Sequence, residues 1–197
     1  MSTNSFFIFG SLSEGMCLFD KIKSFVTTCE EATFRGSAYR LKVGYPVLSK
    51  DGTDLIQGQL VQCPDSEIVL NLFDELMGFN SMYLEKSLNL RERILVDTEM
   101  GKKEAYIYFV NPVKLTGQAK YIENGDWQKS VADVPPLPMK LNEKQKSYIQ
   151  KLGKCTGRDI VPIDLSLYRE LMNLELVIDK GRRIALTKLG REVFRYI

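Results

Sequence analysis

The chain of 197 residues contains no histidine. This absence excludes Ser-His-Asp and Cys-His nucleophile systems within the chain, and it excludes most catalytic zinc sites, which use imidazole ligands. Any acid–base chemistry must therefore use Asp, Glu, Lys, Tyr, Cys or groups of the substrate.

Cysteine is scarce and scattered. No two of the four thiols form a Cys-x-x-Cys pair; they are Cys17, Cys29, Cys63 and Cys155. This spacing argues against structural zinc and against a disulfide framework. We expect buried, apolar thiols, no metal and no cofactor.

Long apolar runs are also missing. No stretch approaches the roughly 20 residues that a membrane helix needs, and the N-terminal residues lack the basic region and apolar core of a signal peptide. With 44% hydrophobic and 26% charged residues, the composition is that of a globular protein. We expect a cytoplasmic protein without membrane contact.

Charge is unevenly distributed, although the formal net charge is only +2. Residues 1–139 carry a net charge of −4 and residues 140–197 a net charge of +6. The sign changes after a Val-Pro-Pro-Leu-Pro segment, which favours extended, semi-rigid backbone. We predict a first domain over 1–130, a Pro-rich linker over 131–139 and a basic tail over 140–197.

The first domain alternates short apolar runs with turn residues, which predicts many short strands and few helices. We expect strands over 6–9, 32–41, 58–63, 87–96 and 104–110, a helix over 15–27, a second helix that begins at Asp65-Ser66 and runs through Leu76, and a hairpin that turns at Asp51-Gly52. This pattern favours an α+β fold with a small mixed β-barrel and flanking helices.

The tail has a different outline. Helical spacing over 142–152 and 165–174 precedes a hairpin with the tip Lys180-Gly181-Arg182-Arg183, and Thr187 begins a short last helix. This order is typical of a small winged-helix unit. Basic hairpin tips can contact phosphates, but most are simply solvated, so we expect no nucleic-acid partner. The tail would instead dock onto the first domain, a second copy of the chain or another protein, through the apolar residues Leu171, Leu174, Leu176 and Val193.

Two segments carry the strongest chemical indications. The apolar run Phe6–Phe9 passes directly into a Gly-Ser turn, and a buried strand that ends this way can present backbone N–H groups to a ligand. The second segment, Phe73–Phe79, lies at the end of the second predicted helix. With the segments around them, these motifs resemble the γ-glutamylcyclotransferase superfamily, including its γ-glutamylamine cyclotransferase branch.

The resemblance covers about residues 5–130 and rests on the order and spacing of its motifs. The matching segments are Phe9-Gly10-Ser11-Leu12 (Tyr-Gly-Ser-Leu in the family), Gly44-Tyr45-Pro46, Gly58-Gln59-Leu60 (Gly-Glu-Leu), Phe73–Phe79 (Leu-Asp-x-x-Glu-Gly-aromatic), Ala105–Tyr108 and Gly125-Asp126-Trp127. The change from Tyr to Phe at position 9 removes one hydroxyl from the implied pocket.

The resemblance implies an intramolecular aminolysis. The α-amine of a γ-glutamyl group attacks its own γ-amide carbonyl, which forms 5-oxoproline and releases an amine. Because the attack is unimolecular, positioning supplies much of the rate, and backbone donors of the first loop would hold the glutamyl head. The substrate-binding residues that the resemblance implies are Phe9, Gly10, Ser11, Leu12, Tyr45 and Gly78.

The family's proton-transferring carboxylate corresponds here to Met77, and a thioether cannot transfer a proton. Asp74 shares the helix face of Met77 and is the geometric substitute, although an Asp is usual beside the active Glu; Glu14 and Glu85 are other candidates, whereas Glu75 points to another face. Two functions stay open: a pocket for γ-glutamyl compounds that cyclises them if another acid replaces position 77, and a non-catalytic binding or regulatory protein whose tail recruits a partner or DNA.

Overall fold

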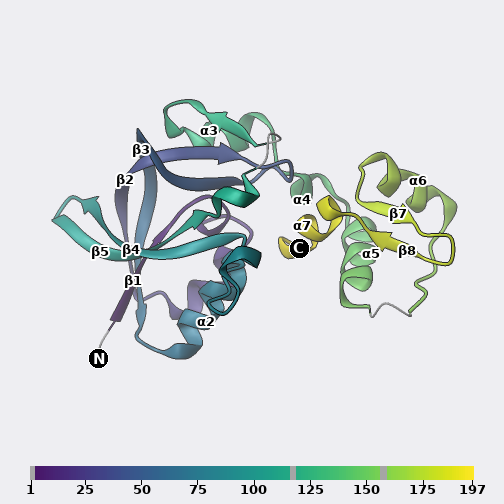
Figure 1. Ribbon diagram of the computed structural model, residues 1–197, viewed down its shortest axis with the longest axis horizontal. Coiled ribbons are helices and arrows are strands. Elements are labelled where there is room, and N and C mark those ends of the chain that lie inside the picture. Colours follow the sequence, from purple (N-terminus) through teal and green to yellow (C-terminus); the bar gives the residue numbers. More distant parts are fainter. Residues whose placement is uncertain (1–2, 116–118, 156–158) are drawn as a thin grey trace. The chain divides into compact units, whose positions relative to one another are not determined.

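The computed structural model describes residues 3–115, 119–155 and 159–197. Internal contacts divide the chain into two compact units, Met1–Val134 and Pro135–Ile197 (Figure 1). No helix within the described ranges is both long and apolar enough to cross a membrane.

The first unit is built on one six-stranded sheet with short helices beside it (Figure 1). Its strands are β1 (Thr3–Ile8), β2 (Thr28–Arg40), β3 (Pro46–Pro64), β4 (Asn89–Thr98), β5 (Gly101–Val110) and β6 (Lys120–Ile122). Its α-helices are α1 (Phe19–Ile22), α2 (Glu67–Met77) and α3 (Trp127–Asp133). The predicted mixed α+β class is therefore confirmed for this unit.

Strand pairing brings β1 next to strands that lie far from it in the sequence. β3 pairs antiparallel with both β1 and β2, and β4 pairs antiparallel with both β5 and β2. β1 also lies parallel to β5, with Phe6 opposite Tyr106. The pairings thus form a circuit through β1, β3, β2, β4 and β5, and β6 adds to β2.

The hairpin predicted around Gly52 is wrong. Its two flanking runs belong to one continuous strand, β3, and both pair with β2 rather than with each other. The register shifts between Ser37, which pairs with Ser49, and Gly36, which pairs with Asp54. The residues between Ser49 and Asp54 therefore form a bulge, and the φ of +122° at Gly52 serves that bulge instead of a chain reversal.

The helix predicted over 15–27 is shorter than expected. Only Phe19–Ile22 is α-helical, and a 3₁₀ turn, Lys23–Phe25, follows it. Gly15 has a φ of +79°, which a right-handed helix cannot include. The spacing of apolar residues here reflects burial of a short, irregular segment.

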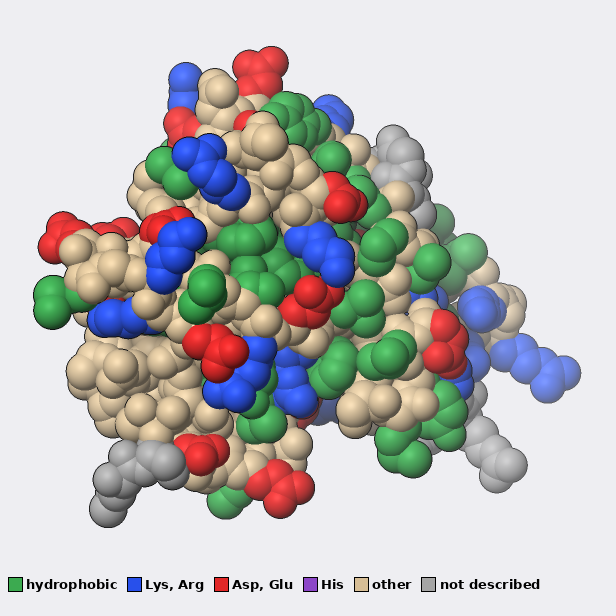
Figure 2. All heavy atoms as spheres, turned by 60° about the vertical axis from the view of Figure 1, so that its left-hand side comes forward, with side chains coloured by type: hydrophobic (Ala, Val, Ile, Leu, Met, Phe, Trp, Pro, Cys, Tyr) green, Lys and Arg blue, Asp and Glu red, His purple; other side chains and the backbone are tan. Residues whose placement is uncertain are grey.

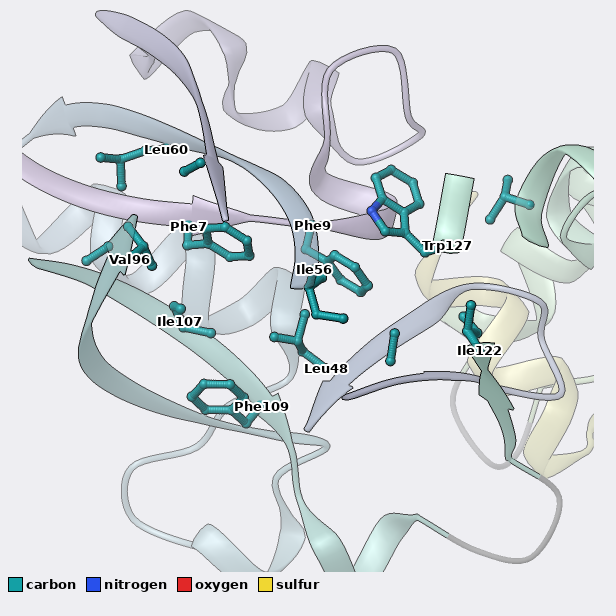
Figure 3. Close-up of a cluster of buried hydrophobic side chains, with 14 residues drawn as sticks. Phe7, Phe9, Leu48, Ile56, Leu60, Val96, Ile107, Phe109, Ile122 and Trp127 are labelled. Carbon is teal, nitrogen blue, oxygen red and sulfur yellow. The ribbon is translucent and has the colours of Figure 1, made fainter. Parts of the chain in front are cut away.

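The core of the first unit lies within the sheet (Figure 3). Its largest members include Phe7, Ile56, Leu60, Phe109 and Trp127. Trp127 is 2% exposed and packs edge-on against Phe9, with ring centroids 5.2 Å apart. Since the Trp127 Nε1–H donates to the Gln57 carbonyl at 2.8 Å, the start of α3 is tied to β3 and to the end of β1.

The second unit contains the helices and the hairpin that the tail sequence predicts. Its elements are α4 (Leu137–Lys140), α5 (Glu143–Lys154), α6 (Leu165–Asn173), β7 (Val177–Asp179), β8 (Ile184–Leu186) and α7 (Lys188–Arg195). The Gly190 N–H donates to Thr187 Oγ1 at 2.9 Å, so Thr187 caps α7 as expected. α4 overlaps the end of the segment 131–139 that we predicted as a linker and continues one residue beyond it.

The apolar residues that we expected to dock the tail are largely internal. Leu171, Leu176 and Val193 are each 0% exposed in the folded chain. Among the described residues of this unit, the large apolar side chains that do face solvent are Met139, Ile160, Leu165, Met172 and Ile178.

Candidate ligand site at the end of the first strand

The chain leaves β1 through a tight turn, Gly10–Leu12, whose shape depends on glycine. Gly10 has a φ of +60°, and a Cβ atom there would lie 2.8 Å from Pro46 Cγ. The Ser13 N–H donates to the Gly10 carbonyl at 3.1 Å, and the Leu18 N–H donates to the Ser11 carbonyl at 3.0 Å. Gly10 and Ser11 are both buried, and no residue in the described ranges accepts a hydrogen bond from either N–H, so the two groups would be available to a ligand that enters this turn.

Four of the predicted binding residues have buried side chains, among them Ser11, which is 5% exposed. Phe9 is 9% exposed, Leu12 is 2% exposed and Tyr45 is 1% exposed. Phe9 belongs to the core cluster in Figure 3, so it can offer a ligand only its backbone. Tyr45 therefore belongs to the interior of the first unit. The expectation of buried thiols is wrong for Cys17 and Cys29, which are exposed, and is confirmed for Cys63.

Helix α2 is placed directly against β1. The Val69 N–H donates to Ser66 Oγ at 3.2 Å, which caps the helix where the sequence predicts its start. Further along, Phe73 stacks on Phe6 with ring centroids 3.9 Å apart and ring planes 4° apart. This stack fixes the helix on the outer side of the strand.

The direction of α2 brings position 77 toward the turn. Thr3 pairs with Pro64 at the end of β3, so the helix that follows begins beside the start of β1 and runs in the same direction as β1. Met77 lies one helical turn beyond Phe73 on the same face, about 6 Å further along the axis. The end of α2 and the turn after β1 therefore lie at the same end of the sheet.

The backbone at the end of α2 is held firmly. Gly78 has a φ of +65° and closes the helix, and the Phe79 N–H donates to the Asp74 carbonyl at 2.8 Å. The Asn89 Nδ2–H donates to the Met77 carbonyl at 2.7 Å. The half-buried Met77 side chain thus starts from a defined position at the edge of the site.

Asp74, the predicted substitute acid, is engaged in another cluster. Its Oδ2 lies 2.6 Å from Arg91 Nη1, and its Oδ1 accepts a hydrogen bond from the Tyr108 hydroxyl at 2.7 Å. Burial, with help from Asp74, raises the pKa of Tyr108, which keeps this hydroxyl protonated and donating. Because both carboxylate oxygens are occupied, the geometry favours a structural role for Asp74.

The other carboxylates that we considered are exposed. Glu14, Glu75 and Glu85 all face solvent. The backbone N–H of Glu14 donates to Gln59 Oε1 at 3.0 Å. Burial raises the pKa of Cys29, and the negative charge of Glu14 adds to this rise. Within the described ranges, none of these three carboxylates is hydrogen-bonded to the turn after β1, and no group of three metal-ligating side chains occurs.

Sequence reasoning missed Asn89, which supports the site from β4. It is 2% exposed, and its Oδ1 has no hydrogen-bond partner among the described residues. A lone asparagine at the start of a strand belongs to no motif, so only the meeting of β4 with the end of α2 reveals it.

Fold and site together define a class of protein: an α+β domain in which a mixed sheet carries a backbone-donor turn at the same end as the end of helix α2. The family model of gamma-glutamyl cyclotransferase, AIG2-like, matches residues 6–129. The chain belongs to this family.

Solved structures with the same fold come from distant organisms. YkqA from Bacillus subtilis has a TM-score of 0.50 and 16% identity, and the match covers 94% of this chain and 81% of YkqA. A protein of Arabidopsis thaliana determined in solution has a TM-score of 0.50 and 15% identity, with 80% of this chain and 95% of that chain covered. At such identities the likeness shows the fold alone. No curated protein matches the chain.

Proposed function

We propose that this chain binds γ-glutamyl compounds at the turn after β1 and does not cyclise them efficiently in its native form. The observation that carries the proposal is Met77, which stands on the helix face toward the end of β1 where the family pattern has its Glu. Binding by the turn needs only backbone groups, which the sequence retains. Catalysis needs a proton-transferring side chain, which position 77 no longer supplies.

The reaction explains why this one side chain matters. A bond forms between the α-nitrogen and the γ-carbonyl carbon, and the bond from that carbon to the leaving nitrogen breaks. One proton must leave the α-nitrogen and one must reach the leaving amine. The N–H groups of Gly10 and Ser11 can stabilise the oxygen that becomes negative, but they cannot move that proton. General acid–base help of this kind is worth about 10²–10⁴-fold.

The test measures 5-oxoproline release from γ-glutamyl amines by the native chain, by Met77→Glu and by Met77→Gln. We expect release by Met77→Glu at a rate about 10²–10⁴-fold above that of the native chain. Met77→Gln has nearly the same shape as the Glu variant and should bind without turnover. Isothermal titration of the native chain should show saturable binding of a γ-glutamyl compound and none of the α-glutamyl isomer.

Two results would contradict the proposal. Release by the native chain at the rate of Met77→Glu would mean that another acid acts at this site, with Asp74 the first candidate. Failure of every variant to bind a γ-glutamyl compound would favour the second hypothesis, a regulatory protein with a degenerate pocket.

We also propose the finer architecture. The circuit of paired strands in the first unit supports the predicted small β-barrel, and the order of α5, α6, hairpin and α7 supports a winged-helix-like tail. Fluorescence anisotropy of the full chain with duplex DNA at two salt concentrations tests the tail. We expect no salt-sensitive binding; a steep salt dependence would instead indicate phosphate contacts by the hairpin.

A further inference from the structure

A surface loop joins α2 to β4, and both of its ends rest on the candidate site. The Leu88 N–H donates to the Gly78 carbonyl at 2.8 Å, and the Asn89 Nδ2–H donates to the Met77 carbonyl at 2.7 Å. The loop between these bonds, residues 79–88, therefore continues the site outward from position 77.

Buried polar side chains hold the backbone of this loop. Ser87 is 1% exposed, and its Oγ accepts from the Asn80 N–H at 2.8 Å. Asn111, which follows β5, donates to the carbonyls of Leu84 at 3.0 Å and Ser87 at 3.1 Å, and it accepts from the Val113 N–H at 3.3 Å. One asparagine thus joins two 3₁₀ turns, Leu84–Lys86 and Pro112–Lys114, into one preorganised surface.

Large apolar side chains project from this surface. Single exposed apolar side chains are normal on proteins, and Figure 2 shows many among the charged groups of one face. Here, however, four of them gather on the two joined turns and the residues just before the first. These four, which we name the apolar rim, are Met82 (81% exposed), Tyr83 (48%), Leu84 (51%) and Val113 (71%).

The charged residues of the first turn do not oppose this apolar character. Lys86 lies over one face of the Tyr83 ring, with its Nζ 4.3 Å from the ring centroid. Tyr83 is the only aromatic residue of the apolar rim. The neighbouring Glu85 is exposed and carries the opposite charge. Lys114 ends the second turn, so the two turns together carry a small positive charge that solvent screens, and apolar contact is the property on which the rim can discriminate between ligands.

We propose that the apolar rim receives the amine portion of a γ-glutamyl compound and selects apolar amines, such as those of hydrophobic amino acids. This inference rests on the proposed function. If the glutamyl head lies at the turn after β1, its γ-amide must reach position 77 for reaction, and the amine portion then extends toward the loop that follows position 77. An apolar amine would bury apolar surface against the rim, and because the loop 79–88 is already held in place, binding would not cost the entropy of ordering it.

The test compares three ligands that share the glutamyl head: γ-glutamyl-phenylalanine, γ-glutamyl-glycine and ε-(γ-glutamyl)-lysine. Titration calorimetry of the native chain should give about tenfold tighter binding of the phenylalanine compound than of the other two. In the double variant Leu84→Ser, Val113→Ser this preference should fall to about unity, while the affinity for the glycine compound stays the same. Leu95→Ser, which replaces a side chain 60% exposed elsewhere on β4, should keep the native preference.

Each alternative outcome has a defined meaning. Equal affinities of the native chain for all three compounds overturn this inference and leave the proposed function intact. An equal loss of affinity for the glycine and phenylalanine compounds in the double variant, at an unchanged unfolding midpoint, also overturns it, because the rim would then act on the glutamyl head. Failure of all three compounds to bind refutes the proposed function together with the inference.

Discussion

The two segments that border the candidate site contribute to it by different means. The turn Gly10–Leu12 offers backbone N–H groups, and its shape depends on one glycine packed against Pro46. The end of α2 offers side chains, so a single substitution at position 77 changes its chemistry. A site made from backbone withstands many substitutions, whereas a site made from a side chain is lost with one. Ligand recognition can therefore outlast catalysis in the same pocket.

The largest expected effect tests whether α2 is anchored on β1. Phe73→Ala removes a 0% exposed ring that stacks on Phe6, so it should lower the free energy of unfolding by about 3–5 kcal/mol. Ile68→Ala, at a position 73% exposed on the same helix, should change it by less than about 0.5 kcal/mol. Urea unfolding measures both; equal effects would show that the stack does not place position 77.

The next effect separates the structural role of Asp74 from a catalytic one. Asp74→Asn leaves Arg91 without its carboxylate partner, so it should lower the free energy of unfolding by about 1–3 kcal/mol. Glu75→Gln, at the exposed neighbouring position, should have little effect on unfolding. In the Met77→Glu background, Asp74→Asn should retain 5-oxoproline release. Abolished release in a folded protein would assign the proton transfer to Asp74.

A substitution at Gly10 tests whether the backbone of the turn Gly10–Leu12 binds the ligand. Gly10→Ala places a side chain at a positive φ and against Pro46, so it should destabilise the fold by about 1–2 kcal/mol and weaken binding of γ-glutamyl compounds. Gly15→Ala imposes a similar strain at a φ of +79° but has open space around it. Calorimetric titration of both variants separates the two effects. Unchanged affinity in Gly10→Ala would place the ligand elsewhere.

The smallest effect concerns pH. Burial and Asp74 raise the pKa of Tyr108 in the folded protein. Below about pH 10 the Tyr108 hydroxyl keeps its proton in both the folded and the unfolded chain, so its hydrogen bond to Asp74 contributes fully to stability there. Above that pH the unfolded chain loses the proton first, so stability should fall by about 1.4 kcal/mol per pH unit from this group. Tyr108→Phe should flatten the slope of urea midpoints between pH 9 and 11.

The sequence predicts those elements whose signals are local. Ser66 and Thr187 mark helix starts correctly because an N-cap depends on three or four neighbouring residues. β4 and β5 also form close to the predicted ranges 87–96 and 104–110. The hairpin at Gly52 fails for the opposite reason, since the choice between a bulge and a reversal depends on pairing with β2, which lies outside any local window.

The candidate site is predictable only in part. The motif order points to the Gly-Ser turn and to position 77, and their role in ligand binding stays a prediction. The occupation of Asp74 by Arg91 and Tyr108 depends on contacts between residues 17 and 34 positions apart, which no spacing rule reveals. The role of Asn111, which joins two turns through backbone carbonyls, is equally invisible in sequence.

The pairing of β1 has a consequence for how the chain folds. Phe6 pairs with Val61 in β3 and with Tyr106 in β5, so the opening strand has no partner nearby in sequence. Contacts of such high sequence separation form slowly, because a long loop must close before they can contribute. During synthesis, β1 must remain unpaired until β3 has emerged, so the turn Gly10–Leu12 that follows β1 also takes shape late.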